Sequence, residues 1–361
     1  MKVLHTADWH INRRHPHYTL KEQVDCLTSC AYDSYTLGAE VCLVAGDVFE
    51  CQHAHVTERN ASMLAAMMIA ELMPVVIVRG NHDGTESLDF FGSLRTQYPI
   101  HTYSTLDTVE IGGVKIAAVP WIRHGYLQAR LPDGVDVDQA GAHMITQVMQ
   151  GLHAQRPDVI VGHLEVGGAS YDNGLAARAV SAVSAHDLIE TGAAYIALGH
   201  IHQEQAFTDG RIRYSGSAWQ TRRGEDRRKG MCVVDLDDRH LTTIRSDLPP
   251  MIDIEHTASN PTTLEIDIEP AHYLVRYETT NDDARRDRDT MEEIRREIMR
   301  KGAMSCSMRP MVTVCDTPRR VSDMPTSVAD KLYSYWQGTD KPRRAADIMA
   351  KRAQIMEGDD V

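Results

Sequence analysis

The segment that decides the fold runs from Val75 to Asp83 and has the sequence Val-Val-Ile-Val-Arg-Gly-Asn-His-Asp. Its first four residues are apolar without alternation, which is typical of a strand buried on both faces. The polar side chains of Asn81, His82 and Asp83 follow almost directly, and such a run after a buried strand needs a reason. Binding residues of α/β proteins lie on loops just past strand ends. The segment therefore predicts a central strand and part of a functional site.

Four other segments have the same character, and each ends in a residue type that binds divalent metal ions. They are Asp8-Trp9-His10, Gly46-Asp47, Gly162-His163 and Gly199-His200-Ile201-His202. With Asn81 they offer imidazole, carboxylate and amide groups but no thiolate, a mixture that suits manganese, iron or zinc better than calcium. Asp-x-His or Gly-Asp alone is more often a surface turn than a ligand, whereas Gly-Asn-His-Asp and Gly-His-Ile-His are stronger signals. All five in one chain predict a metal site.

The carboxylate of Asp47 is the candidate for joining two ions. It follows the apolar run Val41–Val44, and its two oxygens can bridge two cations. Two such ions would lie about 3.5–4 Å apart, hold a bridging water as hydroxide and clamp phosphate oxygens. His82 is predicted to donate a proton to the leaving oxygen, with Asp83 fixing its tautomer. The predicted chemistry is hydrolysis of a phosphate ester.

Up to about residue 245, short apolar runs alternate with amphipathic stretches, which predicts an α/β domain. Strands are expected at residues 41–44, 75–78, 116–119, 159–161, 195–198 and 231–236. Apolar residues recur at helical spacing in three stretches between them. These are Leu20, Val24, Leu27 and Ala31, then Leu64, Met67, Met68 and Leu72, and finally Ala142, Ile145, Val148, Met149 and Leu152.

The pair Pro249-Pro250 marks a boundary, so we expect a domain over residues 1–245 and a small α+β capping domain over residues 246–318. In the capping domain, strands are expected at 264–268, 273–277 and 311–315, with a charged helix over 282–301. Residues 319–361 are expected to form a helical tail with two helices. Tyr335 and Trp336 on this tail indicate either an anchor for a partner protein or a hairpin that packs on its own capping domain.

The composition limits the function classes. Apolar content of 42% and charged content of 25% are ordinary for a soluble globular protein, and no run is long enough to span a bilayer. We see no signal-peptide pattern at the N-terminus. The seven cysteines include no CxxC pair, which suits a reducing cytoplasm without a disulfide framework.

A net charge of −13 argues against nucleic-acid binding by overall charge alone, but local cations can still hold phosphates. Several cations lie near the metal-ligand segments in the sequence, and contacts from them to a DNA backbone would be independent of base sequence. A solvated loop is the alternative, and we weigh the two equally. The candidates are Arg13, Arg14, Arg123, Arg222, Arg223, Arg227, Arg228 and Lys229.

The five segments resemble the motifs of the calcineurin-like metallophosphoesterases, which run D-x-H, G-D, G-N-H-D/E, G-H and G-H-x-H. The flanking residues are similar to those of SbcD-type nuclease subunits, the bacterial and phage counterparts of a double-strand-break repair nuclease. This resemblance covers about the first 245 residues. It is carried by residues 4–10, 46–49, 162–169, 197–202 and 214–217.

The resemblance implies a sandwich of two β-sheets flanked by helices. It also implies one metal site of Asp8, His10, Asp47 and His202, and a second of Asp47, Asn81, His163 and His200, with His82 as the catalytic histidine. The expected ions are two Mn²⁺, with Mg²⁺, Fe²⁺ or Zn²⁺ as alternatives. The implied activity is exonuclease on double-stranded DNA and endonuclease on single strands. Implied partners are an SbcC-type coiled-coil ATPase, bound through the C-terminal helices, and a second copy of the chain.

The chain departs from the family at Ile11-Asn12, where Leu-Gly is frequent, and at Glu50, where His or Asp is common. Both positions bear on how substrate is handled. One rival function is a phosphatase or small-molecule phosphodiesterase on the same core. Phosphoprotein phosphatases of the superfamily carry an arginine shortly after Gly-Asp, and residues 46–51 lack one. A second rival is a non-catalytic binder of DNA ends, although every expected ligand is present.

Overall fold

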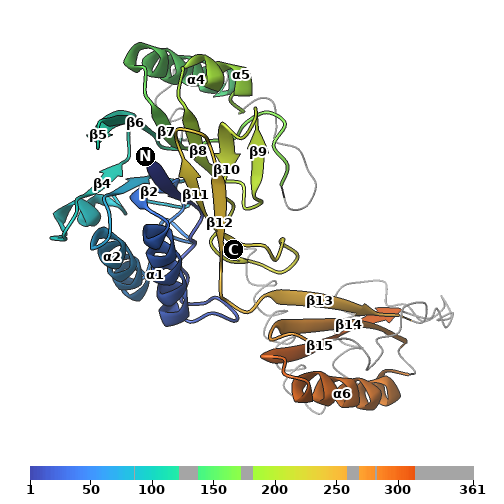
Figure 1. Ribbon diagram of the computed structural model, residues 1–361. Coiled ribbons are helices and arrows are strands. Elements are labelled where there is room, and N and C mark those ends of the chain that lie inside the picture. Colours follow the sequence, from blue (N-terminus) through green and yellow to red (C-terminus); the bar gives the residue numbers. More distant parts are fainter. Residues whose placement is uncertain (85, 122–136, 172–181, 258–267, 281–282, 314–361) are drawn as a thin grey trace, which may run out of the picture. The chain divides into compact units, whose positions relative to one another are not determined.

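Two six-stranded sheets form the body of the protein (Figure 1). The computed structural model describes residues 1–84, 86–121, 137–171, 182–257, 268–280 and 283–313. The first sheet has the strand order β12-β11-β1-β2-β3-β4 and the second β5-β6-β7-β8-β10-β9. The strands of the first sheet are β1 (Lys2–Thr6), β2 (Ala39–Val44), β3 (Val75–Val78), β4 (Ile100–Tyr103), β11 (Gly230–Asp235) and β12 (Leu241–Arg245). Those of the second are β5 (Asp107–Ile111), β6 (Val114–Val119), β7 (Val159–His163), β8 (Tyr195–Gly199), β9 (Gln205–Phe207) and β10 (Ile212–Tyr214).

Helices cover the outer face of each sheet, so the predicted α/β sandwich is confirmed. Helices α1 (Leu20–Thr36) and α2 (Val56–Ala70) lie on the first sheet, and α4 (Val137–Gln155) and α5 (Ala185–Glu190) lie on the second (Figure 1). A short 3₁₀ helix, η1 (Asp89–Ser93), follows β3. Among the described residues, no helix combines the length and apolar character needed to cross a membrane.

The central strands are apolar on both faces because each face has its own core. Val44 and Ile77 pack beneath α1 and α2, whereas Leu43 and Val76 pack between the two sheets. Consecutive residues of a strand point to opposite faces, so a strand between two cores needs an unbroken apolar run. This explains why the runs in β2 and β3 do not alternate. Strands β1 to β4 run parallel, so their carboxyl ends share one edge.

Helix α1 begins where the sequence provides a capping box. The hydroxyl of Thr19 accepts a hydrogen bond from the backbone N–H of Glu22, and the Glu22 carboxylate accepts one from the N–H of Thr19. The predicted apolar stripe of this helix is buried at Val24, Leu27 and Ala31. The helix therefore forms at this position because its cap and its buried face agree.

Helix α2 is present as predicted, but its predicted apolar stripe packs only in part: Leu72, just past the helix, packs against the core. Leu64 is 51% exposed and Met68 is 46% exposed. The side that contacts the sheet is formed by Ala65, Ala66 and Ile69. Small side chains there let the helix approach the sheet closely, which leaves the larger ones outside. On helix α1, Tyr32 and Tyr35 are exposed as well. We call these two tyrosines together with Leu64 and Met68 the α1/α2 apolar face.

A three-stranded sheet with one helix follows the Pro249-Pro250 pair. Its strands are β13 (Met251–His256), β14 (His272–Thr280) and β15 (Ser305–Thr313), and its helix is α6 (Ala284–Arg300). The narrow stripe of α6, with Met291 and Ile298, packs against Tyr273 and Val275. Strand β15 begins at Ser305, whereas the strand predicted from the sequence covers residues 311–315.

Several predictions about this part of the chain stay predictions. Residues 1–277 and 291–309 form one compact unit, and residues 278–290 belong to another. The domain boundaries expected near residues 245 and 319 are not tested by that division. The expected strand 264–268 lies almost wholly outside the described residues, and the tail 319–361 lies entirely outside them. The six cysteines that the structure describes are free thiols.

One buried histidine makes stability depend on pH. The Nε2 of His5 lies 3.1 Å from the backbone oxygen of Leu198, and its Nδ1 lies 2.8 Å from the hydroxyl of Tyr195. Because a carbonyl only accepts, Nε2 donates and Nδ1 accepts from the tyrosine. Burial excludes the charged ring and lowers the pKa of His5 to about 3.

The folded state therefore binds a proton at His5 only at a much lower pH than the unfolded chain, in which the pKa of this histidine is close to its ordinary value. The contribution of neutral His5 to the free energy of unfolding is fully present above pH ~6.5. It is lost as the pH falls from about 6.5 to about 3, by about 1.4 kcal/mol per pH unit. In a His5→Gln variant, the slope of the unfolding free energy against pH should be smaller by the contribution of about one bound proton. Urea unfolding without added metal between pH ~4 and ~7 measures this, and equal slopes would contradict the assignment.

Candidate metal centre

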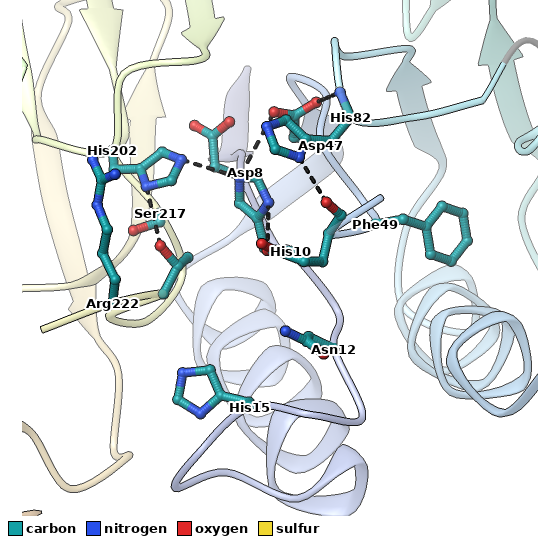
Figure 2. Close-up of polar contacts among 12 residues, drawn as sticks. Asp8, His10, Asn12, His15, Asp47, Phe49, His82, His202, Ser217 and Arg222 are labelled. Atoms are coloured by element: carbon teal, nitrogen blue, oxygen red, sulfur yellow. Dashed lines mark hydrogen bonds and ion pairs between the residues drawn. The ribbon is translucent and has the colours of Figure 1, made fainter. Parts of the chain in front are cut away.

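The structure brings together all seven side chains predicted as metal ligands. Asp8 and His10 follow β1, and Asp47 follows β2. Asn81 follows β3, His163 ends β7, and His200 and His202 follow β8. These strands are parallel neighbours within their sheets, so their carboxyl ends meet at one edge of the sandwich. Figure 2 shows Asp8, His10, Asp47 and His202 pointing toward one another.

The first half of the cluster contains Asp8, His10 and His202. One ligand atom from each lies within 4.8 Å of the other two. The Nε2 atoms of His10 and His202 are 3.0 Å apart. The Oδ2 of Asp47 lies 3.7 Å from the Nε2 of His10. These four residues form the first predicted ligand set.

The second half is built around Asn81. Its Oδ1 lies 2.8 Å from the Nε2 of His163 and 2.9 Å from the Nδ1 of His200. The Oδ2 of Asp47 lies 3.4 Å from the Nε2 of His163. The same oxygen therefore faces both halves, while the Oδ1 of Asp47 accepts the backbone N–H of His82 at 2.8 Å. Asp47 has the position that a bridging ligand needs.

At His163, a ring nitrogen without a hydrogen faces two oxygen atoms that also accept hydrogen bonds. Its Nδ1 lies 2.7 Å from the backbone oxygen of Ala45, so Nδ1 carries the hydrogen. In the neutral ring, Nε2 is then a lone pair. It points at the carboxylate of Asp47 and the amide oxygen of Asn81. A cation or an extra proton between His163 and Asp47 resolves the arrangement.

The rings of His10 and His202 also bring two nitrogen atoms together in the cluster. The Nδ1 of His202 lies 2.9 Å from the Oε1 of Glu225 and must donate to it. The Nδ1 of His10 lies 3.1 Å from the Oε2 of Glu50, an ion-pair contact without the geometry of a hydrogen bond. His202 therefore presents its Nε2 lone pair to the Nε2 of His10 at 3.0 Å, and in the metal-free protein the His10 Nε2–H can donate to it. A divalent ion fits this donor set of nitrogen and carboxylate oxygen.

Without an ion, a proton must take its place. Burial alone would lower the pKa of His10, but the Glu50 contact and the charge of Asp47 outweigh it and raise that pKa to about 9. For His163, the charge of Asp47 likewise outweighs burial and raises the pKa to about 9. Burial and the neighbouring His163 instead lower the pKa of His200 to about 3. A metal ion would thus displace protons from His10 and His163 on binding.

Close backbone approaches explain the glycines of two motifs. A Cβ on Gly80 would lie 2.0 Å from the Oδ1 of Asp47, and one on Gly199 would lie 2.0 Å from the backbone oxygen of Ala45. A side chain at either position would push neighbouring loops apart. Left-handed backbone is concentrated at the same place, with positive φ at Asp8, His10, Asp47 and His200. Such strain collects at functional sites, where the surrounding fold enforces it.

His82 lies beside His10 in the cluster, and the group that orients it is not the expected one. Its Nδ1 is 2.6 Å from the backbone oxygen of Glu50, so that main-chain group fixes the tautomer. The ring of His82 packs edge-on to that of His10, with centroids 4.8 Å apart. The predicted partner, Asp83, instead accepts the backbone N–H groups of Phe49 at 3.0 Å and Gly80 at 2.9 Å. Asp83 ties the two motif loops together.

Three polar partners of the histidines were not predicted from the sequence. They are Glu50 at His10, Glu225 at His202, and Tyr171, whose hydroxyl lies 3.3 Å from the Nε2 of His200. Nothing in the spacing of Glu225 or Tyr171 signals this role. Glu50 lies three residues after Asp47, which is the one available hint.

Of the predicted DNA-binding arginines, three are exposed near the cluster. Arg13 and Arg14 are exposed, and in the part of the chain that the structure describes neither guanidinium forms an ion pair. The side chain of Arg222 is 66% exposed and lies 3.4 Å from Glu225 (Figure 2). Arg123 lies outside the described residues.

The other cations are already occupied. The guanidinium of Arg223 contacts Asp253 at 3.1 Å and the Nε2 of His17 at 2.9 Å. Arg227 and Arg228 are exposed but pair with Glu269 and Asp226. Lys229 is buried, and its Nζ lies 2.7 Å from the backbone oxygen of His202 and 3.3 Å from Glu225. Arg223 and Lys229 therefore support the local structure.

Known proteins share these features. The calcineurin-like phosphoesterase family matches residues 1–204. The SbcD component of the nuclease SbcCD from Staphylococcus epidermidis is 25% identical over 257 residues, which cover 67% of each protein. The crystal structure of TT1561 of Thermus thermophilus matches with a TM-score of 0.43 and 14% identity, covering 68% of this chain and 98% of that one. That last similarity carries no argument about function.

The family match covers more than half of the chain and contains every segment with a predicted ligand. The resemblance predicted from the five motifs is thereby confirmed, and the donor set described above suits the divalent metals that such phosphoester hydrolases use. The chain belongs to the calcineurin-like phosphoesterases, as a metallophosphoesterase of the SbcD type.

Proposed function

We propose that this chain is a two-metal-ion DNA nuclease, an exonuclease on double-stranded DNA and an endonuclease on single strands. The observation that carries the proposal is the convergence of all seven predicted ligands at one edge of the sandwich, because this set of imidazole, carboxylate and amide groups suits divalent ions. The similarity to a nuclease component supports DNA as the substrate. We place its role in DNA end processing, recombination and repair.

Asp8, His10, Asp47 and His202 would hold one ion, and Asp47, Asn81, His163 and His200 the other. When bound, the two ions supply Lewis acidity at the phosphate and a water activated as the nucleophile. Mixed nitrogen and oxygen ligands without thiolate favour Mn²⁺, with Mg²⁺, Fe²⁺ or Zn²⁺ as alternatives.

The residues around the ions have separate roles in the reaction. The Oδ2 of Asp47 faces both halves and would keep the two ions at a fixed separation. His82 donates its Nδ1 hydrogen to the backbone oxygen of Glu50, which leaves its Nε2 for the substrate. With a second proton on Nε2, the ring would deliver that proton to the leaving oxygen and keep its Nδ1 hydrogen on Glu50. Asp83 holds the loops that carry Asp47 and His82.

Arg13, Arg14 and Arg222 are the arginines that we propose for DNA contact, with Arg227 and Arg228 after release from their exposed ion pairs. Replacing the first three with alanine should weaken duplex binding and reduce the slope of log affinity against log salt by about 0.9 for each lost phosphate contact. Filter-binding or anisotropy titrations from about 50 to about 200 mM salt measure this slope.

Arg223→Ala is the matched control, because its guanidinium is held by Asp253 and His17. This variant should keep the salt slope and lower the unfolding free energy instead. An unchanged slope in the triple variant, or a reduced slope in the control, would contradict the assignment.

Purified protein with Mn²⁺ should digest linear duplex DNA and cut single strands, which tests the proposed activity. A phosphatase would instead act on nitrophenyl phosphate and a phosphopeptide while leaving DNA intact. The Val48-Phe49-Glu50 sequence after Asp47 lacks the arginine of phosphoprotein phosphatases, which disfavours that alternative. A non-catalytic binder of DNA ends would bind duplex ends without cutting them.

The proposed partners are DNA, a second copy of the chain and an SbcC-type coiled-coil ATPase, in the cytoplasm. The relative's name describes it as one component of SbcCD. We propose the α1/α2 apolar face for the homodimer, because large apolar side chains are exposed there. We propose the tail, residues 319–361, for the ATPase. A chain ending before Arg319 should keep its dimer mass and its cleavage but lose ATPase binding.

A further inference from the structure

A cavity of about 370 Å³ lies between the segment after β10 and the chain that follows β12. Tyr18, just before α1, also lines it. Its lining residues all belong to the compact unit that contains residues 1–277, and they are distinct from the seven predicted metal ligands. A cavity of this size can hold one small molecule.

The rim of this cavity carries two arginines. Arg227 is 56% exposed and pairs with Glu269, which also lines the cavity, and Arg228 is 76% exposed and pairs with Asp226. Ion pairs at such exposed positions contribute little to stability, so an incoming anion can take over either guanidinium at small cost. The planar fork of a guanidinium matches the oxygens of a phosphate group.

A third cation, Lys229, belongs to the buried part of the lining. Its Nζ lies 3.3 Å from the carboxylate of Glu225, which balances its charge, and 2.7 Å from the backbone oxygen of His202. Lys229 is therefore committed to the local structure. The two rim arginines are the groups that an anion would contact.

The rest of the lining includes aromatic and apolar side chains, namely those of Tyr18, Trp219, Leu248 and Pro250. The hydroxyl of Tyr18 already donates to the backbone oxygen of Pro249 at 2.8 Å. The indole N–H of Trp219 is buried and has no hydrogen-bond partner among the described residues. A buried donor of this kind is uncommon in folded proteins, and a ligand or a water molecule in the cavity could supply its acceptor.

This lining sets the chemical class of the ligand. Inorganic phosphate would use the arginines but leave the apolar walls without a partner, and an uncharged base would do the reverse. A nucleoside monophosphate carries both parts, because its base is a flat apolar body and its phosphate is an anion. Bases pack well against aromatic side chains, and arginines bind the phosphate.

We propose that this cavity binds a nucleoside monophosphate, with its phosphate at Arg227 and Arg228 and its base against the walls formed by Tyr18, Leu248 and Pro250. The same group could come from a released product or from the unpaired end of a DNA strand. Binding here needs neither metal nor cleavage, although the choice of a nucleotide among anions rests on the proposed nuclease function.

Calorimetric titration of the full chain, freed of metal by dialysis against EDTA and then buffer, tests the proposal. Deoxyadenosine monophosphate should bind once per chain and at least about tenfold more tightly than either deoxyadenosine or inorganic phosphate. Equal affinity for inorganic phosphate would show that the base makes no contact. Equal affinity for deoxyadenosine would show that the arginines take no part. Either result, or no binding of the nucleotide, would overturn the inference.

Variants place the nucleotide in the cavity. Arg227→Ala/Arg228→Ala should weaken binding of deoxyadenosine monophosphate by at least about tenfold and leave that of deoxyadenosine unchanged. Arg239→Ala, at an exposed position on the β11–β12 turn, is the matched control and should bind as wild type. An equal loss in the control would show an effect of overall charge and contradict the site.

Leu248→Trp adds a large side chain to the cavity wall and should weaken binding of both ligands. Leu248 also packs against the core, so urea unfolding should show that this variant is folded. If it is not, the rim variants decide, because their positions are exposed. Unchanged nucleotide affinity in the rim variants would overturn the inference.

Competition identifies the source of the nucleotide. Displacement of deoxyadenosine monophosphate by a short single-stranded oligonucleotide would assign the cavity to a strand end, and no displacement would assign it to the free product. Either result supports the site. A chain that digests DNA with Mn²⁺ but does not bind the nucleotide would overturn this inference and leave the proposed function intact. A chain that binds the nucleotide but cuts no DNA would overturn the proposed function alone.

Discussion

Asp47→Asn is expected to abolish Mn²⁺-dependent cleavage, lowering turnover by about a thousandfold or more. The Oδ2 of Asp47 lies 3.7 Å from the Nε2 of His10 and 3.4 Å from the Nε2 of His163, so this oxygen faces both halves. Asparagine keeps the size, and its Oδ1 can still accept the N–H of His82. It lacks the charge and the second oxygen that a bridge requires.

Metal stoichiometry and turnover on linear duplex DNA should be measured together on this variant. The expected result is loss of at least one ion together with the loss of cleavage. Asp238→Asn, an exposed carboxylate on the β11–β12 turn, is the control and should behave as wild type. Digestion at the normal rate by the Asp47 variant would remove the basis of the proposed mechanism.

His82→Gln is expected to reduce turnover by about 10²- to 10⁴-fold while both ions still bind. His82 is not among the seven predicted ligands, and its Nδ1 is engaged by the backbone oxygen of Glu50. The loss should therefore fall on proton delivery to the leaving oxygen. Metal stoichiometry of the variant should equal that of wild type.

The leaving group distinguishes this role from a structural one. A nitrophenolate leaves without a proton, so the defect of His82→Gln should shrink on a nitrophenyl phosphodiester and stay large on DNA. An equal defect on both substrates would exclude His82 as the proton donor. Loss of bound metal in the variant would show that His82 acts as a ligand.

The central fold and the ligand cluster were predictable because both follow from local patterns. An unbroken apolar run indicates a strand between two cores, and β2, β3, β7 and β8 are such strands. A polar residue just past each run falls at the shared edge of a parallel sheet. Asp47 and Asn81 could therefore be placed side by side without coordinates.

The edge strands could not be predicted in the same way. Strand β5 (Asp107–Ile111) is only partly buried, and β9 (Gln205–Phe207) has three residues. Such strands form because a neighbouring strand offers unpaired backbone groups, which leaves little mark on composition. The packing side of α2 was also missed, because Leu64 and Met68 outweigh the alanines in hydrophobicity while the alanines allow closer approach.

The groups that orient the histidines depend on tertiary proximity. Glu225 is 23 residues from His202 in the sequence, and it contacts the ring only because the segment after β10 folds back. Asp83 is adjacent to His82, yet its oxygens point to the backbone N–H groups of Phe49 and Gly80. Sequence spacing finds residues that share a loop but does not give the direction of a side chain.

The most direct test of the account is a crystal of the full chain grown with Mn²⁺, with anomalous scattering recorded to locate the ions. The account predicts two peaks about 3.5–4 Å apart, with the carboxylate of Asp47 between them. Asp8, His10 and His202 should surround one peak, and Asn81, His163 and His200 the other. A single peak, or a pair of peaks away from Asp47, would contradict it.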